Sequence, residues 1–106
     1  MFPNLNPAWS THAAGFQISV GAVAVLSPSS VNIASIIRTG VGVYDITMDA
    51  LMDPGDGILF LMGGAIGIGV FDTIITSTVI TVNVLDFATG LTDGIFKFIY
   101  FRFRTP

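Results

Sequence analysis

Side chains able to act as nucleophiles or general bases are few in this sequence. Its one histidine, His12, follows Ser10 by two positions, and there is no cysteine. A serine becomes a nucleophile when an imidazole, itself oriented by a carboxylate, lies beside its hydroxyl. Closeness in sequence does not supply that geometry, so we assign His12 a packing or hydrogen-bonding role. The lack of cysteine removes disulfides, zinc thiolates and thiol nucleophiles. We therefore predict a protein that is not an enzyme.

The densest group of acidic residues comprises Asp45, Asp49, Asp53 and Asp56. Hard cations such as Ca²⁺ take several oxygen ligands, and the loop Asp53–Gly57 offers two carboxylates and some carbonyls. It lacks, however, the spaced acidic positions and closing glutamate of a calcium loop. Paired carboxylates also serve glycosidases, but the sequence shows no groove for a sugar. We expect turn-forming aspartates, with no metal and no cofactor.

Basic and aromatic residues alternate near the C-terminus, where Phe101, Arg102, Phe103 and Arg104 follow one another. Such interleaving can bind single-stranded nucleic acid. The whole chain has only four Lys or Arg side chains and a net charge of −3, so we predict no nucleic acid partner. Arginine and aromatic residues are also enriched at protein interfaces. We expect these four residues to form a subunit interface in which the arginines meet aspartates of a neighbouring subunit.

The composition supports an interface. Hydrophobic residues make up 52% of the 106 residues and charged ones only 10%, with a mean hydropathy of +0.80. Ordinary domains are about 25% charged. A folded monomer of this mass exposes roughly 5,700 Å², which leaves about one charge per 500 Å². We therefore expect one small domain that buries much of its outside in a membrane or against other subunits.

Two features argue against the membrane. The first 37 residues carry no charge, but Phe2-Pro3-Asn4-Leu5-Asn6-Pro7 lacks the basic start and apolar core of a signal peptide. The most apolar later window, between Asp56 and Asp72, has 15 residues, five of them glycine. A spanning helix needs about 20 residues, and Gly63-Gly64 is more simply a turn between two strands. A small membrane protein, such as a lysis pore, stays an alternative that a helical circular dichroism spectrum would establish.

The elements expected to position these residues are strands. Ile, Val and Thr together number 33, whereas Glu is absent, a composition that favours sheet over helix. In Thr73–Leu85 both alternating faces are partly apolar, as in a strand covered on two sides. The same period predicts strands at Phe16–Val25, Val31–Arg38, Val41–Asp49, Ile58–Met62, Ala65–Phe71 and Ile95–Arg104.

Short strands separated by turns every ~8–12 residues are typical of a sandwich or jelly roll. The predicted turns lie at residues 27–30, 39–40, 53–57 and 88–94. We predict an all-β fold, a single-domain antiparallel jelly-roll sandwich of about eight strands, spanning residues 15–106. Residues 1–14, rich in Pro and Asn, are expected to form an extended N-terminal arm.

Three stretches carry a resemblance to a known group of proteins. Residues 37–49 include Arg38-Thr39-Gly40-Val41-Gly42-Val43-Tyr44-Asp45-Ile46-Thr47, which resembles an R-x-G-x-G-x-Y-x-[IV]-T strand of jelly-roll virion proteins. Residues 79–86 resemble their penultimate strand, and residues 93–103 resemble their closing strand. Such proteins are the capsid decoration (cement) proteins and fibre tips of tailed bacteriophages, whose fold is similar to the complement and tumour-necrosis-factor trimers.

This resemblance implies a homotrimer on the capsid surface of a virion. It would stabilise the shell by binding the major capsid protein or neighbouring decoration subunits, without catalytic residues. The sequence has no coiled-coil or β-helical shaft, which favours a decoration protein over a fibre tip. The alternative is a trimeric fibre-tip or lectin-like module that binds a host surface glycan.

The expected arm supplies the candidate contacts with the capsid, since an extended segment can add a strand to a neighbour's sheet. Its apolar and rigid side chains are the candidates: Phe2, Pro3, Leu5, Pro7 and Trp9.

Overall fold

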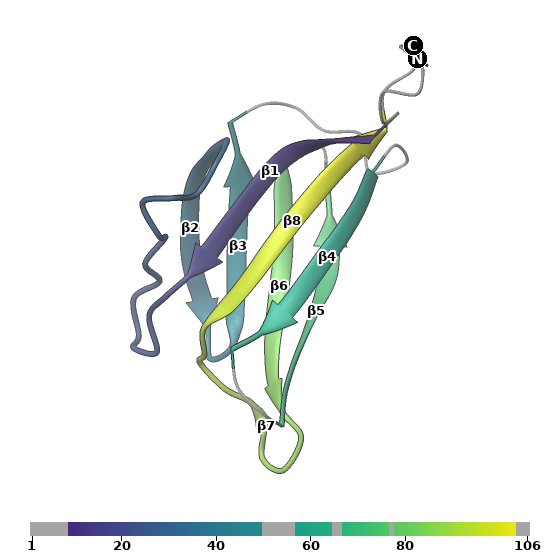
Figure 1. Cartoon of the computed structure of the whole chain (residues 1–106). Helices are drawn as coiled ribbons and strands as arrows, with labels where there is room; N and C mark the ends of the chain where they lie inside the picture. The colour runs from purple at the N-terminus through teal and green to yellow at the C-terminus, as the bar shows by residue number, and fades with distance from the viewer. Residues whose placement is uncertain (1–8, 50–56, 65–66, 77, 104–106) are drawn as a thin grey trace, which may run out of the picture.

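The computed structural model describes residues 9–49, 57–64, 67–76 and 78–103, and these form strands and loops without a helix. The strands build two antiparallel sheets that face each other (Figure 1). The predicted all-β class is therefore confirmed. No helix in this part of the chain is long and apolar enough to span a membrane. The strands are β1 (Trp9–Gln17), β2 (Ile33–Gly40), β3 (Val43–Met48), β4 (Gly57–Gly63), β5 (Ile68–Ile75), β6 (Val79–Asp86), β7 (Gly90–Leu91) and β8 (Phe96–Phe103).

Half of the described strand pairs join strands that are not neighbours in sequence: β1 with β8, β4 with β8, and β3 with β6. One sheet has the order β1-β8-β4, and the other has the order β2-β3-β6-β5, with the short β7 beside β6. Figure 1 shows β1, β8 and β4 lying across the second sheet. The last strand is thus the central strand of the three-stranded sheet, with the first strand on one side of it.

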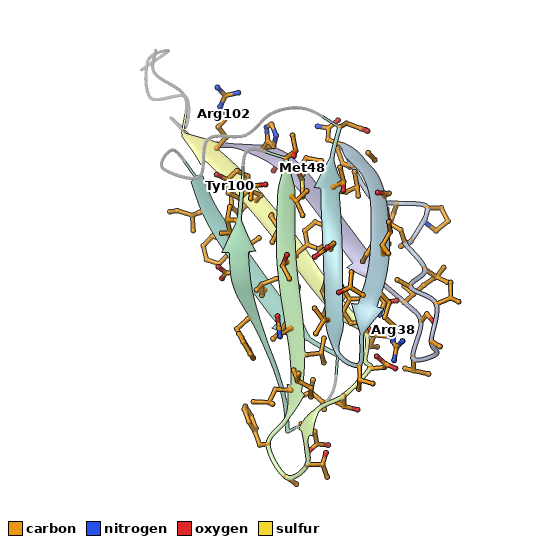
Figure 2. All side chains as sticks on the ribbon, turned by 180° about the vertical axis from the view of Figure 1, so that it is seen from behind. Arg38, Met48, Tyr100 and Arg102 are labelled. Carbon is orange, nitrogen blue, oxygen red and sulfur yellow. The ribbon has the colours of Figure 1, made fainter. Side chains whose placement is uncertain are left out.

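The core lies between the sheets and follows the period of two along β3, β6 and β8. Because successive side chains of a strand point to opposite faces, one alternating set from each strand is buried. Figure 2 shows two of these side chains, Met48 and Tyr100, between the sheets. The buried set is Tyr44, Ile46 and Met48 from β3, Ile80, Val82 and Val84 from β6, and Phe96, Phe98 and Tyr100 from β8.

The single strand predicted over Thr73–Leu85 is wrong, because β5 ends at Ile75 and β6 begins at Val79. Thr76 makes the turn between them. Its backbone N–H donates to the carbonyl of Val79 at 2.8 Å, and its hydroxyl accepts from the Val79 N–H at 3.0 Å. A threonine hydroxyl that binds nearby backbone competes with the sheet ladder, so the chain turns here without Gly or Pro.

The strand predicted over Phe16–Val25 is also wrong after Gln17, where the chain leaves the sheet. The side chain of Gln17 bonds to the backbone of Ser19 and Val25, which holds the following segment in a loop. β1 instead begins at Trp9, so residues 9–14 of the expected arm are part of a strand that pairs with β8. Phe2, Pro3, Leu5 and Pro7 lie outside the described residues.

The remaining strand predictions differ from the structure mainly at their ends. The turn expected at residues 39–40 lies at Val41-Gly42 instead, where Gly42 has a φ of 69°. Such a left-handed conformation favours glycine, and this glycine decides where the β2–β3 hairpin turns. β5 begins at Ile68 rather than Ala65. Of the loop expected at residues 53–57, only Gly57 is described, as the first residue of β4.

Candidate interaction surface

The outward side of the three-stranded sheet is apolar along its central strand. On β8, Phe96, Phe98 and Tyr100 point into the core, so the alternate residues Ile99 and Phe101 point away from it. Ile99 is 38% exposed. A strand with apolar residues on both faces can bury only one of them inside its own sandwich. The other face is left for solvent or for a partner.

β4 extends this apolar side across the sheet. Ile58, Phe60 and Met62 are paired in register with Phe101, Ile99 and Lys97 of β8, and they lie on the same side of the sheet. Phe60 is 56% exposed and Met62 is 63% exposed. The rings of Phe60 and Phe101 meet edge to face, with centroids 5.6 Å apart. Seven of the outward side chains of this sheet are called the outer face: Phe16, Ile58, Phe60, Met62, Lys97, Ile99 and Phe101.

Lys97 is the one charged residue among these outer-face side chains, and an aromatic ring accommodates its charge. Its Nζ lies 5.0 Å from the ring centroid of Phe16 on β1, a cation–π geometry. A hollow of about 220 Å³ with apolar walls lies between Phe60, Met62, Lys97 and Ile99. A partner with apolar side chains would therefore contact one charged group, the Lys97 ammonium beside the Phe16 ring, and the hollow next to it.

The outward side of the other sheet differs in chemistry. On β3 and β6 it carries Asp45 and Thr81, which are paired in register and joined by a hydrogen bond of 2.7 Å. Thr47 and Asn83 flank them on the same two strands. The two outer surfaces of the sandwich are thus unlike: one is polar at its centre, and the other is almost wholly apolar.

The expected interface residues near the C-terminus do not all lie together. Phe101 belongs to the outer face. Arg102 follows it on the opposite side of the strand, exposed near the end of β8 and opposite Gly57 and Ser10 in register (Figure 2). The side chain of Phe103 and all of Arg104 lie outside the described residues.

Sequence reasoning missed the contribution of β4 to this surface. The local signal was a strand without a charge whose two alternating sets are both apolar, so that one set is left outside the core. Trp9, proposed as an arm contact, instead lies in β1 opposite Phe103 in register, and its side chain is outside the described residues.

His12 lies in β1, and its ring meets that of Tyr100 edge to face, with centroids 5.8 Å apart. Its backbone carbonyl accepts a hydrogen bond of 2.8 Å from the Asn32 side chain. Within the described ranges, no group of three or more His, Asp or Glu side chains is placed to hold a metal ion.

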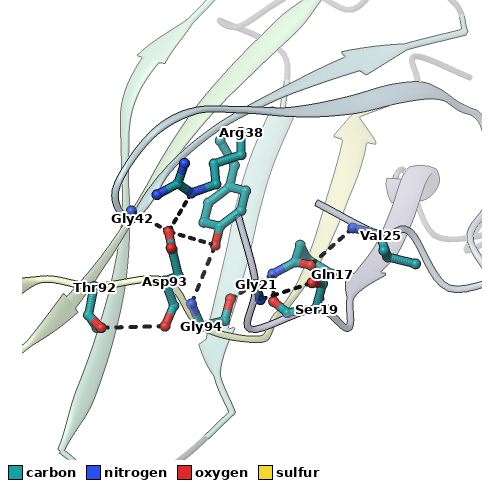
Figure 3. Close-up of polar contacts among 10 residues, drawn as sticks. Gln17, Ser19, Gly21, Val25, Arg38, Gly42, Thr92, Asp93 and Gly94 are labelled. Carbon is teal, nitrogen blue, oxygen red and sulfur yellow. Dashed lines mark hydrogen bonds and ion pairs between the residues drawn. The ribbon is translucent and has the colours of Figure 1, made fainter. Parts of the chain in front are cut away.

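A second cluster of polar residues lies at the loops of one end of the sandwich (Figure 3). Asp93, in the loop before β8, accepts hydrogen bonds at its Oδ1 from Arg38 Nε at 2.8 Å and from the Gly42 N–H at 2.9 Å. The Tyr44 hydroxyl donates to the same oxygen at 3.4 Å. Asp93 thus fastens the last loop to the β2–β3 hairpin.

This network continues through the peptide of Gly94. Its N–H donates to the Tyr44 hydroxyl at 3.4 Å, and its carbonyl accepts from Gln17 Nε2 at 2.7 Å. Gln17 is fully buried, and its amide also binds backbone groups of Ser19 and Val25. Three loops that are far apart in sequence are therefore tied together, which is a structural role.

The charge of Asp93 makes the stability of the fold depend on pH. The hydrogen bond from Arg38, helped by the Gly42 N–H, lowers the pKa of Asp93 below its usual 3.8. A carboxylate with a lowered pKa in the folded state stabilises the fold above its unfolded pKa, and that contribution is lost as the pH falls toward the folded pKa. We expect the melting temperature to drop below about pH 4, as measured by circular dichroism.

The variant Asp93→Asn isolates this contribution. Its melting temperature should lie below that of the wild type at neutral pH, and the gap should narrow as the pH falls from about 4 to 2. A gap that stays constant over that range would mean that Asp93 does not carry the acid dependence. Burial raises the pKa of Tyr44 above 10.0, so its hydroxyl stays protonated over the same range.

Comparisons with known proteins assign no function to the outer face or to the Asp93 network. No family model matches the chain, and neither a curated protein nor a solved structure matches it.

Proposed function

We propose that the protein is a structural subunit of a virion, a capsid decoration protein that associates as a homotrimer and binds the capsid shell. The observation that carries the proposal is the outer face, an apolar side of a sheet with one charge among its described side chains. Monomeric proteins rarely expose a continuous apolar patch larger than a few hundred Å². Such a side of a sheet is suited to permanent contact with protein.

The strand order supports the jelly-roll interpretation of the fold. β8 lies between β1 and β4, and β6 lies between β3 and β5, so the connections cross between sheets as they do in Greek-key arrangements. A stable interface buries about 800 Å² on each partner. Each Å² of apolar area buried stabilises the contact by roughly 25 cal/mol. Three adjacent strands contribute side chains to such a contact.

The test changes the centre of the outer face. Ile99→Lys places a second cation beside Lys97, so burial of the face against another copy would become unfavourable. We expect light scattering to give a mass of three copies, or of a multiple of three, for the wild type and a lower mass for Ile99→Lys. The matched control is Ile37→Lys on the outward side of the other sheet, where Ile37 is 57% exposed, and it should keep the wild-type mass.

The capsid role has its own readout. Wild-type protein should co-sediment with decoration-free capsid shells from the source virus, and Ile99→Lys should do so less, because a trimer binds with several contacts at once. Far-UV circular dichroism checks that both variants are folded. A wild type that is monomeric at all concentrations would overturn the trimer, and a trimer that never sediments with shells would overturn the capsid role.

A further inference from the structure

One of the four sheet edges is built differently from the others. Strands at the edge of a sheet expose unpaired N–H and C=O groups, and natural proteins protect them with loops, charges or bulges. In the described part of the chain, β1, β4, β2 and β5 are the edge strands. The protection of the unpaired N–H and C=O groups differs among these four strands.

β1 is covered by the loop that follows it. Its residue Ala14 exchanges two backbone hydrogen bonds with Val31, at 3.1 and 2.8 Å, and Phe16 accepts another from Ser27 at 2.8 Å. This edge is already occupied by the protein's own backbone.

The edges of the other sheet are interrupted. β5 has an irregular register between Asp72 and Ile74, and Asp72 is exposed there. β2 has register shifts near both ends and carries the charge of Arg38. A bulge or a charge at an edge hinders the addition of another strand.

Among the residues that the structure describes, nothing protects β4 in any of these ways. It pairs with β8 in unbroken register from Gly57 to Gly63, and its sequence contains no charge and no proline. In the described residues its other side pairs with no strand. The side chains of Phe60 and Met62 beside this edge are largely exposed.

The backbone groups that face this free edge can be identified. Gly64 N–H donates to the carbonyl of Ile95 at 3.1 Å, one position beyond the paired Gly63 and Phe96. Hydrogen-bonded pairs alternate along an antiparallel ladder, so the even-numbered residues of β4 bond to β8. The N–H and C=O groups of Leu59 and Leu61 consequently point outward at the free edge.

The sequence of β4 is nearly a palindrome, Gly-Ile-Leu-Phe-Leu-Met-Gly, centred on Phe60. In an antiparallel pair of two β4 strands related by a twofold axis at Phe60, glycine meets glycine, leucine meets leucine and Ile58 meets Met62. Leu59 and Leu61 of each copy would then exchange the hydrogen bonds. A twofold contact requires a self-complementary surface of this kind.

We propose that β4 pairs with β4 of a second copy of this chain, antiparallel about Phe60, so that two three-stranded sheets become one sheet of six strands. The partner is a second copy because, in that register, the side chains of β4 lie opposite the same or similar side chains of the other β4. In the same register the outward N–H and C=O groups of Leu59 and Leu61 lie opposite each other. The contact uses the edge of the sheet, whereas the proposed trimer contact uses its outer face. If the twofold axis of this contact meets the threefold axis of the trimer at a right angle, the two contacts together close at six copies.

The lack of cysteine in the chain allows a direct test by disulfide cross-linking. The two Phe60 residues would form a non-hydrogen-bonded pair with Cα atoms about 4.5 Å apart, within the range for a disulfide. Oxidised Phe60→Cys should run as a dimer on a non-reducing gel. Ile37→Cys is the matched control, since Ile37 is 57% exposed against 56% for Phe60, and it should remain largely a monomer on the gel.

A charge exchange tests the register without a covalent bond. Phe60→Lys and Phe60→Glu alone each place like charges opposite one another across the axis, so neither should pair at the edge. Their mixture should form a heterodimer contact, seen as a rise in mass by light scattering. If Phe60→Cys cross-links no better than Ile37→Cys and the mixture shows no gain in mass, the edge contact does not exist.

The same measurements separate this contact from the outer-face trimer. The cross-link of Phe60→Cys should persist when Ile99→Lys is added, because Ile99 is not at the edge. A wild-type mass of three copies without a cross-link would reject the edge and keep the trimer. A mass of two copies with a cross-link would do the reverse.

Discussion

Replacing Gly42 with alanine is expected to lower the free energy of unfolding by about 4 kcal/mol. Gly42 has a φ of 69°, which an alanine adopts only with strain. An added Cβ would also lie 2.7 Å from the carbonyl oxygen of Val84 and 2.8 Å from the backbone nitrogen of Thr92. Backbone atoms of two other segments cannot both move away, because Val84 N–H donates to the Gly42 carbonyl at 2.7 Å.

Gly67→Ala is the matched control for Gly42→Ala. Gly67 has a φ of 81°, but a Cβ there would meet no atom within 4 Å. Gly67→Ala should lower the free energy of unfolding only by the strain of an alanine in the left-handed conformation, about 1–2 kcal/mol. Urea unfolding followed by circular dichroism measures both variants. Equal losses in the two would show that the close approach of Val84 and Thr92 to Gly42 has no energetic consequence.

Gln17→Leu is expected to lower the free energy of unfolding by about 3 kcal/mol. Leucine has a similar volume, so the change removes hydrogen bonds more than packing. The Gln17 amide donates at 2.7 Å to the carbonyls of Ser19 and Gly94, and it accepts from the N–H groups of Ser19 at 2.7 Å and Val25 at 3.3 Å. Without it, these partly buried backbone groups lose their partner, and each unsatisfied group carries a penalty.

Ser19→Ala serves as the control for Gln17→Leu. The Ser19 hydroxyl accepts one exposed hydrogen bond, from Gly21 N–H at 3.1 Å, and its loss should change stability by no more than about 0.5 kcal/mol. The same urea titrations compare the two. A Gln17→Leu protein as stable as Ser19→Ala would indicate that water replaces the amide at this position.

Alternation in the sequence predicted the strands whose two faces differ clearly. β3 and the inward set of β8 are examples, because aromatic or long aliphatic residues recur at every second position. The arm is predicted for residues 1–14 because that segment is rich in Pro and Asn, yet residues 9–14 belong to β1. What holds β1 in place is its pairing with β8, about 80 residues later in the chain. A local sequence pattern does not identify a partner strand that lies so far along the chain.

The sequence predicts that an interaction surface exists, but not which residues form it. Scarcity of charge indicated that some face must be covered, but in β4 both alternating sets are apolar, Leu59 and Leu61 on one side and Phe60 with its neighbours on the other. Nothing local decides which set faces the core. The link between Arg38 and Asp93 also joins residues 55 positions apart, which single-sequence patterns do not connect.

The position of β8 has a consequence for how the chain is made. β8 leaves the ribosome after β1 and β4, yet both strands depend on it as their partner in the sheet. Contacts between distant segments slow folding, and the three-stranded sheet assembles only after β8 has been synthesised. Until then the uncharged β4 is without its partner strand, so the nascent chain at this stage is prone to aggregate and benefits from a chaperone.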